Sequence, residues 1–374
     1  MSAETSGSGM GATPRRSLHV GSAMIDIICI VAEQNVERMT FSNDAKSFLM
    51  LEAGRKVPAQ SISSHVGGGA CNTAVSLARR GWDAAVLART GNDHNAGAVR
   101  AHLAEHGVSA DWVQTASDAA TGTAVMVASH DRNASIFVHR GANEGIAEAD
   151  LADAAFAGRD LVHIAPLSSR SADAFPAIAA KGRAAGAFVS ANPGIRHLTS
   201  RTEALLRAMG DVDLISVNRV EAEALVPAIA AREGEGPDER LGEGAPELLR
   251  RGLSSSGFAM GLLRWLAAMR ALGPRYVVLT DGTDGAWLAG PDGVIWRPSL
   301  PAEVAGTAGA GDSFTSTLGA ALCEGVGAAE AMLQAAVNAA SVVSAIDTTS
   351  GLLERAVLER KAATVGETAL FEAA

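Results

Sequence analysis

The chain has 374 residues, enough for one large α/β domain or two ordinary ones. Its residues are 48% hydrophobic but only 4% aromatic, with 40 glycines, which suits helices packed on a sheet better than an all-β sandwich. A formal net charge of −10 at pH 7 and the lack of a basic stripe argue against a general nucleic-acid-binding protein.

The first residues do not predict a secretion signal. The opening MSAETSGSGMGATPRRS lacks the charge and apolar pattern of a signal peptide, so residues 1–16 are expected to form a flexible tail. The next apolar stretch, 18–31, is interrupted by His19 and Asp26 and is too short to cross a bilayer. The three cysteines lie far apart, without the spacing of metal ligands, as is typical of core thiols in a reduced compartment. We therefore expect a cytoplasmic protein with no membrane association.

The first part of the chain mixes strands and helices. Apolar periodicity predicts strands at 18–31, 83–90, 121–131 and 134–141, and helices at 70–81 and 98–107. The last two strands alternate between apolar and polar residues and are separated by turn residues, as in an antiparallel pair. They suit a small accessory sheet better than the central one.

Beyond residue 150 the alternation becomes regular. We expect strands at 160–167, 187–194, 213–218 and 276–282, a hairpin around 287–296, and helices at 172–186, 201–210, 219–231, 261–273 and 313–325. Strands and helices in this rhythm predict right-handed βαβ units and a parallel sheet covered on both faces. Residues 232–258 interrupt the rhythm, because they are rich in Glu, Gly, Arg and Ser, and are expected to form a mobile surface insertion.

The stretch AGTAGAGDSF, residues 305–314, places one carboxylate after a segment with almost no side chains. Gly309, Ala310 and Gly311 allow a ligand to approach the backbone, and the helix that follows presents unpaired amides and a positive dipole end, which suits a phosphate. Asp312 would repel that phosphate unless it accepts a proton from an attacking hydroxyl. An ordinary N-cap explains an aspartate at this place equally well.

The stretch GTAGAGDSF resembles the D-T-x-G-A-G-D signature of the ribokinase-like (PfkB) carbohydrate kinase family. The stretch GGGACNTAVSLARRG is similar to the family's N-terminal signature, with Gly67, Gly68 and Asn72 at its fixed positions. Five further matches follow in the family's order: Asp26 in GSAMIDI, RTGND, RGAN, Asn218 with Glu221, and Thr280 with Gly282. Together these matches extend from about residue 18 to 352.

The resemblance implies an α/β fold of the ribokinase-like type, a three-layer αβα arrangement with a central, mostly parallel sheet and a small β lid. It implies a single kinase domain over 17–365 after the tail 1–16. The lid is expected from about 33–66 and 112–142, with the surface insertion at about 232–258. Relatives often pair through this lid, so a homodimer is expected.

For the chemistry, the resemblance implies that Asp312 is the catalytic base and that Gly309 to Gly311 form the anion hole. Asp26 corresponds to the acid that hydrogen-bonds substrate hydroxyls, and Gly68 and Asn72 to the wall of the substrate pocket. The residues alone leave open that Asp26 caps a loop and that Asn72 caps the start of a helix.

On the nucleotide side, the resemblance assigns the remaining matches to ATP and Mg²⁺. Thr280 and Gly282 correspond to the loop beneath the ATP phosphates, and Asn338 to a position bordering the adenine. Asn218 and Glu221 correspond to residues that organise Mg²⁺ and its waters. From the residues alone, Asn218 and Glu221 equally fit a capped first turn of a helix.

Three positions depart from the ribokinase pattern. Gly306 replaces the first Asp of the signature, which helps hold a monovalent cation in potassium-activated relatives, so little activation by K⁺ is expected. Met24 stands where ribokinases carry an Asn that contacts sugar, and Gly69 where they carry a Lys. The apolar residue before Asp26 is closer to the nucleoside-kinase branch.

The sequence therefore predicts an ATP- and Mg²⁺-dependent kinase that phosphorylates a hydroxyl of a sugar or sugar acid, with no nucleic-acid partner. A nucleoside kinase of the same family is the first alternative. A non-catalytic descendant that binds a metabolite is the second, although such a protein has no need of Asp312 beside the phosphate site. A dinucleotide-binding dehydrogenase is disfavoured because no G-x-G-x-x-G follows the first strand.

Overall fold

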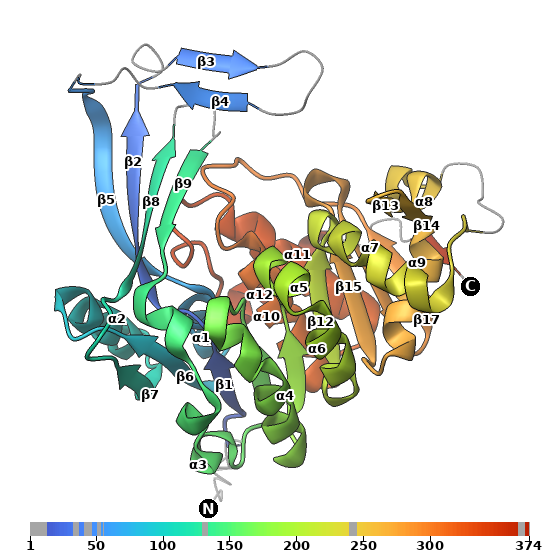
Figure 1. The fold of residues 1–374 in the computed structure, drawn as a ribbon, viewed down its shortest axis with the longest axis horizontal. Helices are drawn as coiled ribbons and strands as arrows, with labels where there is room; N and C mark the ends of the chain where they lie inside the picture. Colours follow the sequence, from blue (N-terminus) through green and yellow to red (C-terminus); the bar gives the residue numbers. More distant parts are fainter. Residues whose placement is uncertain are drawn as a thin grey trace, which may run out of the picture.

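The computed structural model describes residues 13–32, 37–40, 47–50, 54, 56–128, 134–238, 245–365 and 371–373. A large sheet with helices on both faces forms the body, and a smaller sheet projects from one end of it (Figure 1). This α/β arrangement confirms the predicted fold class.

The large sheet is parallel except at one edge. Its strand order is β18 (Phe371–Ala373), β17 (Gly293–Arg297), β16 (Ala286–Gly290), β15 (Tyr276–Thr280), β12 (Leu214–Asn218), β11 (Phe188–Ala191), β10 (Leu161–Ile164), β1 (Arg16–Val20), β6 (Asp83–Thr90) and β7 (Ser109–Thr115). The pairs from β15 to β7 are parallel, whereas β16, β17 and β18 add an antiparallel edge. The central strands are buried along their length, as expected where helices cover both faces.

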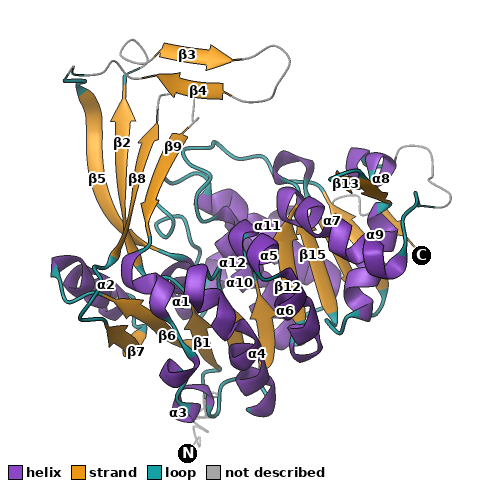
Figure 2. Cartoon of the chain, in the orientation of Figure 1, coloured by secondary structure: helices purple, strands orange, loops and turns teal. Residues whose placement is uncertain are grey.

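The helices form layers on the two faces of this sheet (Figure 2). In chain order they are α1 (Gly69–Arg79), α2 (His94–Glu105), α3 (Asp153–Phe156), α4 (Phe175–Ala184), α5 (Ile195–Ser200), α6 (Thr202–Arg207), α7 (Arg219–Glu233), α8 (Glu247–Arg251), α9 (Leu262–Ala271), α10 (Ala310–Cys323), α11 (Ala328–Val342) and α12 (Arg355–Val365). Alternate strand residues serve the two layers: Leu214 and Val278 pack with α10 and α11, while their neighbours Ile215 and Val277 pack with α7 and α9.

The smaller sheet has the order β5 (Ala59–Gly67), β2 (Met24–Val31), β8 (Gly122–Ala128) and β9 (Ala134–His139). We call these four strands the lid. Beyond it, β3 (Glu37–Thr40) and β4 (Ser47–Met50) pair as a separate antiparallel hairpin. The turn predicted between β8 and β9, and parts of the predicted lid segment 33–66, lie outside the described residues. Residues 112–115, predicted to begin the second lid segment, lie instead in β7 of the large sheet.

The single strand predicted over 18–31 is wrong, because the chain changes sheets within it. β1 ends at Val20 in the large sheet, and β2 begins at Met24 in the lid. The change occurs at Gly21, where a Cβ atom would lie 2.8 Å from Ala165 Cβ, so the chain turns past the next strand only with glycine there. The residues on both sides of the turn are apolar, so the hydrophobic pattern of the sequence does not indicate the change of sheet.

Two other expectations need correction. The helix predicted over 98–107 begins earlier, at His94, because Asp93 caps it by accepting a hydrogen bond from Ala96 N at 2.9 Å. The predicted insertion 232–258 begins inside α7 and contains α8 and a hairpin of β13 (Leu253–Ser255) and β14 (Phe258–Met260). Leu248, Leu249 and Leu253 are buried there against the main core, so the described part of this segment is packed structure. Among the helices that the structure describes, none combines the length and apolarity needed to cross a bilayer.

Candidate active site

Asp312 lies in the first turn of α10. It follows Gly309, a position where any other residue would be strained. Gly309 adopts φ 80°, and a Cβ atom there would lie 2.9 Å from Thr348 Cβ. The N–H groups of Gly311 and Asp312 have no acceptor in the part of the chain that the structure describes, and that of Ala310 has only a long 3.5 Å contact with Thr307 O. Space around Gly311 is open, since a Cβ there would meet nothing within 4 Å. Free amides and open space together suit an anion.

The Asp312 carboxylate is oriented by α1. Asn72 Nδ2 donates to Asp312 Oδ2 at 2.8 Å, and Asn72 Oδ1 accepts from Thr348 Oγ1 at 2.8 Å. Burial raises the pKa of Asp312, and the hydrogen bond from Asn72 acts against that rise. Asn72 was predicted as part of the substrate pocket wall, and its amide is held by Asp312 and Thr348. It therefore sets the position of the carboxylate.

Three consecutive glycines bring a second carboxylate to the same place. A Cβ at Gly67 would lie 1.9 Å from Asp26 Oδ2, and one at Gly69 would lie 3.6 Å from Asp312 Oδ1. Gly68 has φ 96°, and a Cβ there would lie 2.5 Å from Ser22 O. Asp26 thus occupies the space that a side chain at 67 would fill, whereas at 69 Ala165 Cβ is the nearest atom, at 2.8 Å, and Asp312 lies beyond it.

Asp26 belongs to lid strand β2, opposite His65 of β5. Burial and the negative charge of Asp312 together raise its pKa to about 6, against an opposing effect of His65. Two carboxylates of which one raises the pKa of the other, one from the lid and one from the body, are typical of a site that binds hydroxyl groups or moves protons.

A large cleft opens between the lid and the body on the side of α11. Its volume is ≈ 1660 Å³, and it is lined by lid residues such as Ile28 and Met126 and by the loop that includes Gly306 and Thr307. This cleft leads to the start of α10, and it is large enough for a nucleotide.

Asn338 does not line this cleft. It is buried, its Nδ2 donates to Thr317 Oγ1 at 2.8 Å, and its Oδ1 accepts from Leu353 N at 2.9 Å. Its neighbours Val337 and Ser341 line the cleft instead. Both ends of the Asn338 amide are used inside the protein, and the expectation that this position borders the adenine stays a prediction.

Asn218 and Thr280 are register partners at the carboxyl ends of β12 and β15, an edge where parallel sheets bind ligands. Asn218 caps α7, accepting from Glu221 N at 2.9 Å, while Glu221 Oε2 accepts from Asn218 N at 2.8 Å. Burial raises the pKa of Glu221. The capped turn left open by the sequence is therefore present, and the backbone of Ile195 also donates a hydrogen bond to the Glu221 carboxylate. Gly282 follows with φ 55°.

A smaller cavity of ≈ 220 Å³, which the sequence did not reveal, lies where lid residues such as Met24 and Val138 meet the body. Asn143, from the RGAN motif, shapes it by accepting from Ala23 N at 2.9 Å and donating to Ala23 O at 3.0 Å. Its wall also includes Met24, Arg140 and Arg196. These residues come from segments far apart in the chain, so no local motif groups them.

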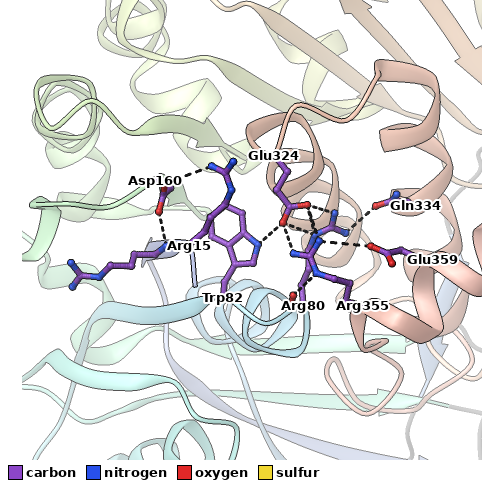
Figure 3. A network of polar contacts seen from close by, with 9 residues as sticks. Arg15, Arg80, Trp82, Asp160, Glu324, Gln334, Arg355 and Glu359 are labelled. Carbon is purple, nitrogen blue, oxygen red and sulfur yellow. Dashed lines mark hydrogen bonds and ion pairs between the residues drawn. The ribbon is translucent and has the colours of Figure 1, made fainter. Parts of the chain in front are cut away.

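The far end of α10 carries a polar network that is separate from the site (Figure 3). Glu324, which follows the last residue of α10, accepts hydrogen bonds from Arg80, Trp82 and Arg355. Gln334 of α11 also accepts from Arg80, at 3.0 Å. The network ties α1, α10, α11 and α12 together, so the helix that carries Asp312 is fixed at both ends.

Comparison with known proteins agrees with this geometry. The family model described as pfkB family carbohydrate kinase matches residues 17–241 and 256–355, so the insertion around α8 falls largely in the gap. A curated ATP-dependent ribose-1-phosphate kinase from Halopiger xanaduensis is 25% identical over 265 residues, 71% of this chain and 76% of its own length. The ribokinase of Bacillus subtilis is 24% identical over 316 residues, 84% of this chain and 92% of its own length.

Solved structures share the fold. The structure of Arabidopsis thaliana ribokinase complexed with ribose and ATP superimposes with a TM-score of 0.70 at 21% identity, covering 94% of this chain and 99% of that one. The arrangement of a large sheet, two helix layers and a projecting lid is thus that of ribokinase.

Proposed function

The chain belongs to the pfkB family of carbohydrate kinases, and we propose that it transfers the γ-phosphate of ATP to a hydroxyl of a sugar or sugar-like substrate, with Asp312 as general base. One observation carries the proposal: Asn72 holds the Asp312 carboxylate beside the unpaired amides of Gly311 and Asp312. A base and an anion site side by side are what transfer of a phosphoryl group to a hydroxyl requires.

In the proposed reaction, a substrate hydroxyl lies between Asp312 and the γ-phosphorus of ATP. The hydroxyl proton passes to Asp312, the oxygen forms a bond to phosphorus, and the bond to the β-phosphate oxygen breaks to release ADP. The amides of Gly311 and Asp312 stabilise negative charge on the transferred group. Asp26 holds other hydroxyls of the substrate, which orients the reacting one.

Mg²⁺ fits the carboxyl ends of β12 and β15. The Glu221 carboxylate and the neighbouring Asn218 would hold the ion through water, and the ion would neutralise charge on the ATP phosphates. Thr280 and Gly282 lie at the same edge and would support the phosphates. The cleft of ≈ 1660 Å³ supplies the space for the rest of the nucleotide.

A nucleoside kinase is the second candidate, favoured by one observation. Met24 lines the small cavity next to Asp26 and offers an apolar contact where a ribokinase offers an amide. A nucleobase fits such a contact better than a free sugar does.

A screen of ATP consumption tests the proposal. The names of the two curated relatives place ribose and ribose 1-phosphate first in a panel that also contains sugar acids and nucleosides. We expect ADP release that depends on one of these acceptors and on Mg²⁺. Binding of ATP without acceptor-dependent ADP release across the panel would contradict the kinase and favour a non-catalytic descendant.

We also propose that two copies pair through the lid. By strand register, Ile62 and Phe137 lie on the lid face opposite to Ile28 and Met126, which line the cleft. Ile62 is 68% exposed and Phe137 is 63% exposed, which is costly for two large apolar side chains of a monomer. Sedimentation velocity of the wild type and of Phe137→Glu tests this: a dimer that the substitution dissociates is expected, and a wild-type monomer contradicts it.

A further inference from the structure

Two arginines meet at the small cavity beside Asp312. Arg140 follows the last lid strand, β9, and Arg196 lies in α5 of the body, yet both line the cavity of ≈ 220 Å³. Burial and the positive charge of Arg196 lower the pKa of Arg140, while Glu144 raises it. The two guanidiniums therefore lie close enough to repel each other, at a place where the lid meets the body.

Neither arginine forms an ion pair with a described residue. Across the described residues, the guanidiniums of Arg140 and Arg196 form no ion pair and no hydrogen bond, whereas most other arginines near the core are paired. Glu144, the acid whose charge acts on Arg140, accepts a hydrogen bond from Ser169 Oγ at 2.8 Å. Ser169 adopts a left-handed backbone (φ 53°), a strained state for a residue other than glycine, while it holds that carboxylate. Among the described residues, Glu144 attracts Arg140 without forming an ion pair with it, so the two repelling cations share no paired acid.

The cavity adjoins the proposed reacting hydroxyl. A Cβ at Gly69 would lie 3.6 Å from Asp312 Oδ1 and 3.1 Å from Pro166 Cδ, and Pro166 lines the cavity. Position 69, which carries no side chain, therefore lies between Asp312 and one residue of the cavity wall.

We propose that Arg140 and Arg196 bind an anionic group of the acceptor, a phosphate or a carboxylate, while a hydroxyl of the same molecule lies at Asp312. Guanidiniums present planar pairs of donors that match both groups, and two of them match the double charge of a phosphate best. That the bound molecule is the acceptor of a kinase rests on the proposed function. That the two arginines bind an anion does not depend on it. Because one arginine comes from the lid side and the other from the body, the bound anion would also hold the lid closed.

Calorimetric titration without ATP tests the site separately from catalysis. The probes are ribose, ribose 1-phosphate and ribonate, which are a neutral sugar, a sugar phosphate and a sugar acid of the same carbon skeleton. We expect one anionic probe to bind at least about 10-fold more tightly than ribose, as one charge-assisted hydrogen bond provides. Tighter binding of ribose 1-phosphate identifies a phosphate site, and tighter binding of ribonate a carboxylate site.

Arg140→Gln and Arg196→Gln should each weaken binding of the preferred anion by about 10- to 100-fold and leave ribose binding unchanged. Arg207→Gln, an exposed arginine of α6 outside the cavity, is the matched control and should change neither. Equal binding of all three probes, or unchanged anion binding in both variants, overturns the inference. If anion binding is lost as expected but no acceptor is phosphorylated with MgATP, the anion site stands and the proposed kinase function fails.

Discussion

Asn72 and Asp312 are 240 residues apart in the sequence, yet Asn72 Nδ2 donates a hydrogen bond of 2.8 Å to Asp312 Oδ2. The bond joins the first turn of α1 to the first turn of α10. The two helix starts on which the candidate site is built are therefore linked through the carboxylate itself.

Asn72→Ala should shift the pH dependence of the reaction upward. The hydrogen bond from Asn72 acts against the rise that burial causes in the pKa of Asp312, so its loss raises that pKa further. A base works only when it is ionised, so kcat/KM falls at low pH. In the variant this fall should occur at a higher pH than in the wild type. The measurement is kcat/KM against pH, with Thr348→Val as a control that alters Asn72 but leaves Asp312 bonded. An unchanged or lowered acid limb contradicts the role of Asn72.

Gly67→Ala should lower the catalytic activity more than the stability of the fold. The new Cβ would lie 1.9 Å from Asp26 Oδ2, so the Asp26 carboxylate must move. Displacement of a positioning group by about 1 Å can cost about 10²-fold in kcat/KM. Gly97→Ala is the control, because Gly97 is exposed in α2 with nothing within 4 Å of its Cβ position, and should keep full activity. Steady-state kinetics that show equal activity in the two variants would remove Asp26 from the site.

Glu324→Gln should lower stability in a pH-dependent way. Burial opposes ionisation of Glu324, but hydrogen bonds from Arg80 and Arg355 prevail and hold its pKa at about 2. Its folded pKa is below the ordinary value of 4.5, so its contribution is complete above pH 4.5 and is lost as the pH falls towards 2. Removing one member of a buried ion pair costs about 3–5 kcal/mol.

Urea unfolding at pH 7 and at pH 3 measures this effect. Glu359→Gln is the matched control, since Glu359 faces Arg355 at 3.7 Å on the surface, where an ion pair is worth about 0–1 kcal/mol. Equal loss of stability in the two variants, or a loss that does not shrink at the lower pH, would contradict the importance assigned to the network in Figure 3.

Potassium should have little effect on the rate. Gly306 supplies no carboxylate, although a Cβ there would lie 3.3 Å from Ala345 O and 3.4 Å from Ile346 O, two carbonyls of the kind that bind K⁺. Rates in KCl and NaCl at one ionic strength should be similar for the wild type, and Gly306→Asp should introduce a dependence on K⁺. Strong stimulation of the wild type by K⁺ contradicts the prediction.

Local patterns in the sequence were sufficient to predict most of the fold. The strand–helix rhythm after residue 150 predicted the parallel sheet, and the glycines before Asp312 predicted the helix start with its open amides. Such features depend on a few consecutive residues, so they can be predicted from a single sequence. The switch of sheets at Gly21 was missed because apolar strands of two sheets follow each other without a break in hydrophobicity.

Contacts between distant segments could not be predicted in the same way. The bond from Asn72 to Asp312, the inward direction of Asn338, and the meeting of Arg140 with Arg196 each depend on how the helices and lid are placed in space. A motif fixes which residue is present, whereas the partner of its side chain depends on the tertiary fold. For this reason the sequence indicated the residues of the site better than their contacts.

Replacement of Asp312 by Asn tests the central claim most directly. The variant keeps a side chain of the same shape but cannot accept the proton of the substrate hydroxyl, so the turnover number should fall by about 10²–10⁴-fold while ATP binding, measured by calorimetry, is retained. Asp292→Asn, in an exposed turn, should behave as wild type. An Asp312→Asn enzyme that phosphorylates its acceptor at the wild-type rate would contradict the assignment of Asp312 as the base.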